Sequence, residues 1–206
     1  RHGLRYYPKL LTAIPFTPVS GLRFLGASAE DRAQLVDAAL DLARGLGASS
    51  WHCLFPPESE AQELAAHGLL LRQGVQFHWN NPGYASFDDF LAGMSHDKRK
   101  KIKQERRRVR EAGVVFEQRV GVEIRESDWV FFERCYQGTY RAHHSTPYLN
   151  LAFFKELGRL LGDNCLLVIA RREDKAIAAA LNIFDGQALY GRYWGATEFV
   201  PGLHFE

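Results

Sequence analysis

The 206-residue sequence predicts a mixed α/β (α+β) fold in which a largely antiparallel sheet is flanked by helices. Two patterns predict it. Apolar residues recur at helical spacing in several stretches, for example at Phe87, Phe90, Leu91 and Met94. Short strand-like runs separated by turn residues fill the last third of the chain. An apolar content of 46% is enough for a buried core.

The first half alternates strands with helices. Its many prolines favour an extended start. Ser28 is expected to cap a helix that ends near Gly45. The residues expected to form the buried face of this helix are Leu35, Ala38, Ala39 and Leu42. The other elements expected in this half are a strand over residues 50–55, a helix over 58–67 and one or two strands over 69–79.

Asn80-Asn81-Pro82-Gly83 is the strongest turn signal in the chain, and it places a boundary between domains at residues 1–80 and 81–206. A basic helix is expected from Ser95 to near Gly113. A helix that begins at Ser127 is expected to bury Trp129, Phe132, Tyr136 and Tyr140. The remaining elements are a strand over residues 114–120, a helix that begins at Asn150, and antiparallel strands over 165–171, 176–184 and 189–194.

We expect the functional site in the last stretch of the chain. Side chains alternate along its strand, so Arg192 and Tyr193 are expected on opposite faces. Gly195 is expected to end the strand and to open it away from its neighbour, which would leave backbone N–H groups available to a carbonyl or a phosphate. The polar and aromatic candidates here are Arg192, Tyr193, Trp194, Glu198, His204 and Glu206.

His204 is the candidate general base, with Glu206 or Glu198 orienting it. The alternative role of His204 is a structural hydrogen bond at the start of a helix. His204 and Glu206 have the spacing of the H-x-E of zinc deaminases, but the P-C-x-x-C that completes that motif is absent. Because H-E-x-x-H and C-x-x-C are absent too, we expect no metal site.

The basic helix is a candidate phosphate-binding element. Residues 97–110 contain nine Lys or Arg and two acidic residues, a net charge of +7, so the rest of the chain carries −5 within the total of +2. Such a helix suits a phosphate backbone or a nucleotide head group. The alternative is a solvated helix with long side chains on the surface. The candidate phosphate-binding residues are Lys98, Arg99, Lys101, Arg106 and Arg110.

Three cysteines, Cys53, Cys135 and Cys165, lie far apart in the sequence. Their odd number and wide spacing fit a reducing compartment and no disulfide framework. The sequence has no run of 18 apolar residues, and its first residues lack the apolar stretch of a signal peptide. We therefore expect a soluble cytoplasmic protein without a membrane span.

Seven stretches together resemble a known family. They are Tyr6–Leu11, Pro15–Val19, Gln76–Trp79, Lys98–Arg110, Pro147–Leu149, Ala179–Asn182 and Leu189–Glu206. They are similar to the bacterial Fem-like predicted N-acyltransferases of the GNAT-like superfamily, which are associated with peptidoglycan biosynthesis or recognition. The resemblance implies two incomplete GNAT-like units, with residues 1–80 as the C-terminal part of the first and 81–206 as the N-terminal part of the second.

The resemblance also implies a reaction. It is the transfer of an acyl or aminoacyl group from acyl-CoA or aminoacyl-tRNA to an amine, with a cell-wall precursor as a candidate acceptor and tRNA as a candidate partner. This transfer needs backbone N–H groups that hold the donor carbonyl and a base for the attacking amine. Tyr148 and His78, which lie in matching stretches, join Arg192, Tyr193 and Trp194 as candidate substrate-binding residues. A structural histidine in the core is the alternative for His78.

Members of the family are longer at both ends. We therefore expect either a fragment or a divergent short form, whose halves complement each other within one chain or in a homodimer. The alternative function is a non-catalytic binding module that recognises a phosphate-bearing ligand or RNA through the basic helix.

Overall fold

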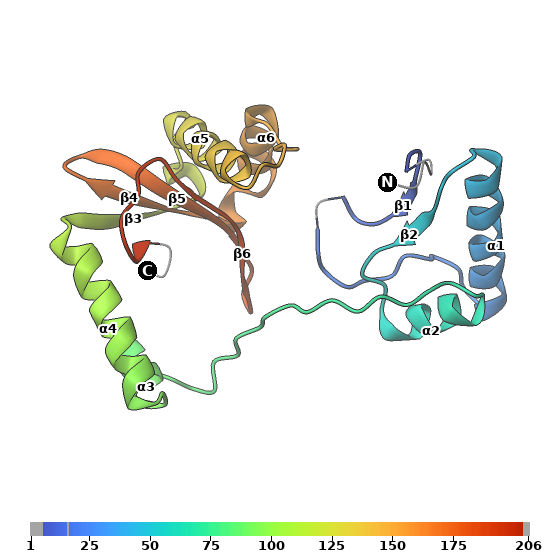
Figure 1. Cartoon of the computed structure of the whole chain (residues 1–206), viewed down its shortest axis with the longest axis horizontal. Coiled ribbons are helices and arrows are strands. Elements are labelled where there is room, and N and C mark those ends of the chain that lie inside the picture. Colours follow the sequence, from blue (N-terminus) through green and yellow to red (C-terminus); the bar gives the residue numbers. More distant parts are fainter. Residues whose placement is uncertain (1–5, 16, 204–206) are drawn as a thin grey trace. The chain divides into compact units, whose positions relative to one another are not determined.

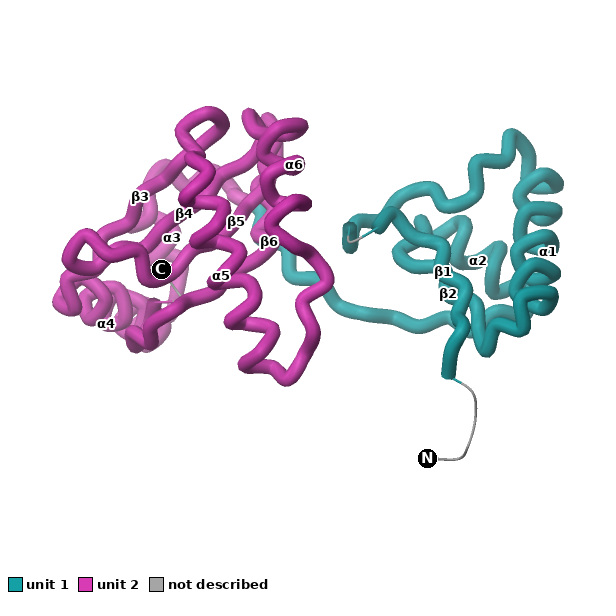
Figure 2. Tube along the Cα trace, turned by 90° about the horizontal axis from the view of Figure 1, so that it is seen from above, with its two compact units in different colours: residues 1–80 teal, residues 81–206 magenta. Residues whose placement is uncertain are grey.

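The structure, a computed structural model, describes residues 6–15 and 17–203. The chain divides into two compact units, unit 1 (residues 1–80) and unit 2 (residues 81–206), which Figures 1 and 2 show. Each unit has its own sheet and its own buried core. The assignment of each unit to part of a GNAT-like unit stays a prediction.

Unit 1 is built on two short parallel strands, β1 (Leu10–Thr12) and β2 (Trp51–Cys53). Helix α1 (Ala29–Gly45) lies between them in the sequence, because parallel strands need a long crossover connection. Helix α2 (Glu58–Ala66) follows β2. Ser28 caps α1 as predicted, in a capping box with its third helical residue.

The buried face of α1 differs from the predicted one. Leu35 and Leu42 are 44% and 53% exposed, so their predicted burial was wrong. Val36 is buried instead and packs against Phe24 and Leu64. Because the sheet of this unit has only two short strands, α1 buries a narrow stripe, which lies one residue away from the predicted stripe.

The strand predicted over residues 69–79 is absent, because this stretch has no regular secondary structure. Its apolar residues Val75, Phe77 and Trp79 are 81%, 97% and 63% exposed. A strand forms only where a neighbouring strand supplies hydrogen bonds. Neither of the two sheets among the described residues includes this stretch.

Unit 2 contains a four-stranded antiparallel sheet in the order β3-β4-β5-β6. Its strands are β3 (Val114–Val120), β4 (Cys165–Arg172), β5 (Lys175–Phe184) and β6 (Leu189–Ala196). Its helices are α3 (Phe87–Ala92), α4 (His96–Glu111), α5 (Glu126–Ala142) and α6 (Leu151–Leu161), with 3-10 turns η1 (Gly121–Glu123) and η2 (Gly162–Asn164). The predicted mixed α/β class with a largely antiparallel sheet is confirmed.

Different elements cover the two faces of this sheet (Figure 1). Ile169 and Ala170 follow each other in β4, so their side chains point to opposite faces. Ile169 packs into the main core with residues of α5 and α6, which include Phe132 and Phe154. Ala170 packs into a second cluster that includes Val109 of α4. Helices α5 and α6 therefore line one face, and α4 lies against part of the other.

Strand β6 does not open away from β5. It is paired as far as Ala196, and the N–H of Thr197 then donates to the carbonyl oxygen of Ile177 at 2.8 Å. The prediction that Gly195 ends and opens the strand was wrong. Gly195 instead allows α5 to approach closely, because a Cβ at this position would lie 2.2 Å from the carbonyl oxygen of Cys135.

Candidate functional site

A β-bulge in β6 shapes the candidate site. Leu181 and Asn182 of β5 pair with Tyr193 and Gly191, so Arg192 is an extra residue in β6. A bulge redirects the side chain that it carries. The guanidinium carbon of Arg192 lies 4.4 Å from the centre of the Tyr193 ring. The prediction that Arg192 and Tyr193 face opposite sides was therefore wrong, because the extra residue interrupts the alternation.

The bulge brings three of the predicted binding residues together. The hydroxyl oxygens of Tyr148 and Tyr193, which are 45 residues apart in the sequence, lie 3.1 Å from each other. Arg192 is also close enough to Tyr148 for its positive charge to lower the pKa of that phenol. A cation and two phenols, from β6 and from the loop before α6, therefore share one place beside the edge of the sheet.

Two tyrosines of α5 hold this group in position. The buried hydroxyl of Tyr136 accepts the backbone N–H groups of Tyr148 and Leu149, each at 3.3 Å. Tyr140 lies one helical turn later, and its ring centre is 4.7 Å from that of Tyr136 and 5.6 Å from that of Tyr148. We call Tyr136, Tyr140, Tyr148 and Tyr193 the tyrosine cluster. The sequence predicted only burial for the two helical members, although their i,i+4 spacing on a helix also places both hydroxyls on one side.

The surroundings of these phenols shift their pKa values in different directions. Burial raises the pKa of Tyr140 and of Tyr193, and hydrogen bonding to Tyr148 raises both further. Burial also acts to raise the pKa of Tyr148, but hydrogen bonds from Tyr140 and Tyr193 together with the charge of Arg192 outweigh it and lower this pKa. Tyr148 is 46% exposed. It is therefore a solvent-accessible phenol that loses its proton more readily than an ordinary tyrosine.

Trp194 follows Tyr193 in β6, so its side chain points to the opposite face of the sheet, where it is 41% exposed. Its carbonyl oxygen accepts the Thr139 hydroxyl of α5 at 3.0 Å. This contact lies on the outer edge of β6, with which no strand of the described residues pairs. The backbone of Trp194 therefore forms part of this edge, whereas its ring points away from the tyrosine cluster.

Glu198 is engaged in ion pairs beyond the end of β6. Its carboxylate contacts Lys175 and Arg172, each at 2.5 Å. The hydrogen bond from Lys175, followed by the positive charges of both partners, lowers the pKa of Glu198. A role for Glu198 as a base or as an orienting group would therefore require these ion pairs to open.

The remaining predicted catalytic and substrate-binding residues are His78, His204 and Glu206. His204 and Glu206 fall outside the described residues. His78 lies in unit 1, in the stretch without secondary structure, where it is exposed and its ring Nε2 is 3.3 Å from the side-chain oxygen of Gln76. The alternative of a buried histidine at position 78 is therefore wrong.

The predicted phosphate-binding residues all lie on α4 but not on one side of it. Arg99, Arg106 and Arg110 have the spacing i, i+7, i+11, which places them along one flank of the helix. Lys98 and Lys101 lie elsewhere around its circumference. The structure therefore aligns three of the five.

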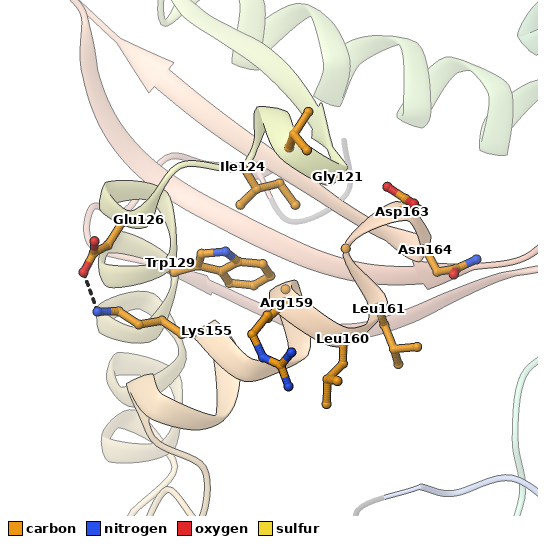
Figure 3. A pocket seen from close by; sticks show the side chains of 13 residues that line it. Gly121, Ile124, Glu126, Trp129, Lys155, Arg159, Leu160, Leu161, Asp163 and Asn164 are labelled. Atoms are coloured by element: carbon orange, nitrogen blue, oxygen red, sulfur yellow. Dashed lines mark hydrogen bonds and ion pairs between the residues drawn. The ribbon is translucent and has the colours of Figure 1, made fainter.

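A separate hollow of about 530 Å³ lies among α5, α6, η1 and η2 (Figure 3). The ring of Trp129 lines it, and Lys155 on its rim is paired with Glu126. Arg159, which also lines it, is paired with Glu156. None of the predicted site residues lines this hollow and its cations are paired, so the tyrosine cluster is the better candidate site.

A family profile for FemAB-like proteins, described as peptidoglycan biosynthesis/recognition, matches residues 1–206. The chain belongs to this family. A similar solved structure is the C-terminal domain (DUF2156) of a protein described as a lysylphosphatidylglycerol synthetase from Agrobacterium fabrum, with 15% sequence identity and a TM-score of 0.47. The match covers 85% of this chain and 53% of that chain, so this FemAB-like chain spans about half of that neighbour's length. No curated protein matches it.

Two searches of the described part of the FemAB-like chain were negative. No helix there combines the length and the apolar character that crossing a bilayer requires. No group of three or more His, Cys, Asp or Glu side chains within it is arranged to hold a metal ion. The cytoplasmic location of the protein stays a prediction.

Proposed function

We propose that this FemAB-like chain is a transferase that moves an acyl or aminoacyl group from acyl-CoA or aminoacyl-tRNA to an amine, with a peptidoglycan precursor as the acceptor class. Its family, which is described by peptidoglycan biosynthesis/recognition, supports this class of acceptor. The observation that carries the proposal is the bulge at Arg192. It gathers Arg192, Tyr193 and Tyr148 beside the outer edge of the last strand.

The reaction defines what the site must do. The amine nitrogen attacks the donor carbonyl carbon, and the new C–N bond forms as the carbonyl oxygen becomes an oxyanion. The bond from this carbon to the donor sulfur or oxygen then breaks. The attacking nitrogen loses a proton, and the leaving group takes up a proton. Fixed positive charge near the oxyanion and a group that accepts the proton both lower the barrier.

The tyrosine cluster and Arg192 match these needs. Arg192 provides a permanent positive charge for the oxyanion. The pKa of Tyr148 is lowered, so its phenol is more readily ionised. The ionised Tyr148 accepts a proton from the attacking amine and then donates this proton to the leaving group. Backbone N–H groups on the outer edge of β6 would hold the donor carbonyl. His204, oriented by Glu206 or Glu198, is the alternative base.

Substitutions within the cluster test this assignment. The chain is incubated with acyl-CoA or aminoacyl-tRNA pools and an amine acceptor, and products are identified by mass spectrometry. Because a positioned acid–base group contributes about 100-fold or more, Tyr148→Phe and Arg192→Ala should each lower kcat/KM by at least about that factor. Tyr190→Phe, which changes an exposed tyrosine of the same strand, is the matched control and should keep the wild-type rate. Wild-type transfer by both cluster variants would exclude this site.

The pH dependence distinguishes Tyr148 from His204 as the base. An ionised Tyr148 is the active form, so the rate should rise with pH up to its pKa, which lies below the usual value of about 10 for tyrosine, and level off above it. A histidine base would produce the same rise near pH 6 to 7. The rise that depends on Tyr148 should disappear in Tyr148→Phe, and a Tyr148→Phe variant with the wild-type pH profile would assign the base role away from Tyr148.

A further inference from the structure

Six of the nine positively charged side chains of α4 lie along one flank of the helix. None of these six residues belongs to the proposed transfer site. Arg99, Lys103, Arg106 and Arg110 follow each other at i, i+4, i+7 and i+11, in a row about 16 Å long. Lys100 and Arg107 lie beside this row, and no acidic residue of α4 lies among the six. We call these six residues the basic flank.

Five of the six charges of the basic flank are at most weakly compensated by the residues that the structure describes. Lys103 lies 3.7 Å from Asp88 and Arg107 lies 3.5 Å from Glu111, and both basic side chains are mostly exposed. Exposed pairs of this kind contribute little binding energy. Arg99, Lys100 and Arg110 form no ion pair with any residue that the structure describes. Most of the positive field of this flank is therefore available to a partner.

The helix that carries the flank is fixed in the fold. Val109 of α4 is fully buried and packs in one cluster with Val200 and Leu203, whose loop follows β6. The apolar side of the helix at Val109 is therefore covered by the protein itself and is not available to another molecule. The helix presents a straight, convex row of charge, which a flat anionic surface can meet along its whole length.

RNA fits this shape less well. The major groove of A-form RNA is too deep and narrow for a helix, and single strands are held by stacking of their bases on exposed aromatic rings. α4 contains no Phe, Tyr or Trp. In the nearby Phe87, one ring face is already covered by the guanidinium of Arg106 at 4.2 Å. The basic flank therefore provides positive charge but no exposed aromatic ring on which a base could stack.

We infer that the basic flank binds the surface of a membrane rich in anionic lipids. Clusters of about four to eight Lys or Arg on one helix are typical of such binding, and each charge near the surface strengthens it. Attachment of this kind is peripheral and electrostatic. It would hold the chain at a lipid surface whether or not the tyrosine cluster catalyses transfer.

Vesicle co-sedimentation of the full chain tests the inference. Vesicles that contain phosphatidylglycerol should bind the chain, vesicles of phosphatidylcholine should not, and salt should weaken the binding. The triple variant Arg99→Glu, Lys103→Glu, Arg110→Glu should bind phosphatidylglycerol vesicles at least about 100-fold more weakly. The matched control reverses three charges elsewhere on the same helix, at Lys98, Lys101 and Arg108, and should lose much less.

Each outcome decides the inference. Equal losses in the two triple variants would show attraction to net charge alone, and the inference would then be wrong. Tighter binding to a short RNA duplex or single strand than to vesicles, with the same dependence on the flank, would assign it to nucleic acid. If the reversed variant does not fold by circular dichroism, the neutral triple change of the same three residues to Gln replaces it and should still weaken binding about 100-fold. No transfer is measured, so a negative result leaves the proposed function untouched.

Discussion

Tyr136 links the core of unit 2 to the candidate site, because its hydroxyl is buried and accepts two backbone N–H groups at Tyr148 and Leu149. Tyr136→Phe keeps the ring but leaves both N–H groups without this acceptor. Since an unsatisfied buried donor costs about 1–3 kcal/mol, the free energy of unfolding should fall by at least about 1 kcal/mol. Urea denaturation measures this loss.

The same substitution should act on the proposed reaction through position alone. Tyr136 contacts no reacting atom, so Tyr136→Phe should lower kcat while the lowered pKa of Tyr148 and the shape of the pH profile persist. Tyr190→Phe, which removes an exposed hydroxyl, should change stability by less than about 0.5 kcal/mol. Equal stability of the wild type and Tyr136→Phe would mean that water replaces the lost acceptor.

For single residues, the sequence indicated which side chains are candidates for a site more readily than the direction in which each side chain points. Arg192 and Tyr193 stand out as polar and aromatic residues in one strand, but the rule of alternation places them on opposite faces. Only the pairing with β5 reveals the extra residue, and pairing joins residues far apart in the sequence. The approach of Tyr148 to Tyr193 is likewise a contact between distant segments, which a local pattern does not encode.

Among the elements, the crossing of α5 and β6 fixes the edge of the sheet next to the candidate site. A Cβ on Gly195 would lie 2.2 Å from the carbonyl oxygen of Cys135 and 2.7 Å from the hydroxyl oxygen of Thr139. Gly195→Ala must therefore push α5 away from β6 or distort the strand. We expect it to lower the free energy of unfolding by about 3 kcal/mol, as overpacking does in tight interiors, and urea denaturation measures it.

Gly138 is the matched control on the other side of the same crossing. A Cβ there would meet the carbonyl oxygen of Ala196 at 3.8 Å, an ordinary contact, and Ala is favoured over Gly inside a helix by up to about 1 kcal/mol. Gly138→Ala should therefore leave stability unchanged or raise it. Similar destabilisation by the two substitutions would show that the close approach at Gly195 does not set the cost.

Local signals explain why most helices and the meander of unit 2 could be predicted. The cap at Ser28 and the cap at Asn150 act within one helical turn, and both occur in the structure. The stretch over residues 69–79 has the apolar pattern of a strand, but a pattern cannot supply the neighbouring edge that a strand needs. Gly195 was predicted to break β6 because the close approach of α5 is not visible in the sequence.

Over the whole molecule, stability is distributed unevenly between the two units. The two cores of unit 2 are large and consist of residues of that unit alone, whereas the buried cluster of unit 1 consists of Phe24, Val36 and Leu64 with a few half-buried neighbours. A small domain buries a small share of its surface and is only marginally stable. Unit 2 is therefore expected to account for most of the cooperative stability of the chain.

Residues 81–206 produced alone should consequently fold and unfold in one cooperative thermal transition, measured by circular dichroism, with a midpoint within about 5 °C of the main transition of the full chain. Residues 1–80 alone should show a weak transition or none. The basic flank and the tyrosine cluster both belong to unit 2, so the isolated unit should also keep the vesicle binding inferred for α4. If the isolated unit 2 shows no cooperative transition, its core depends on unit 1, and unit 2 does not account for most of the stability of the chain.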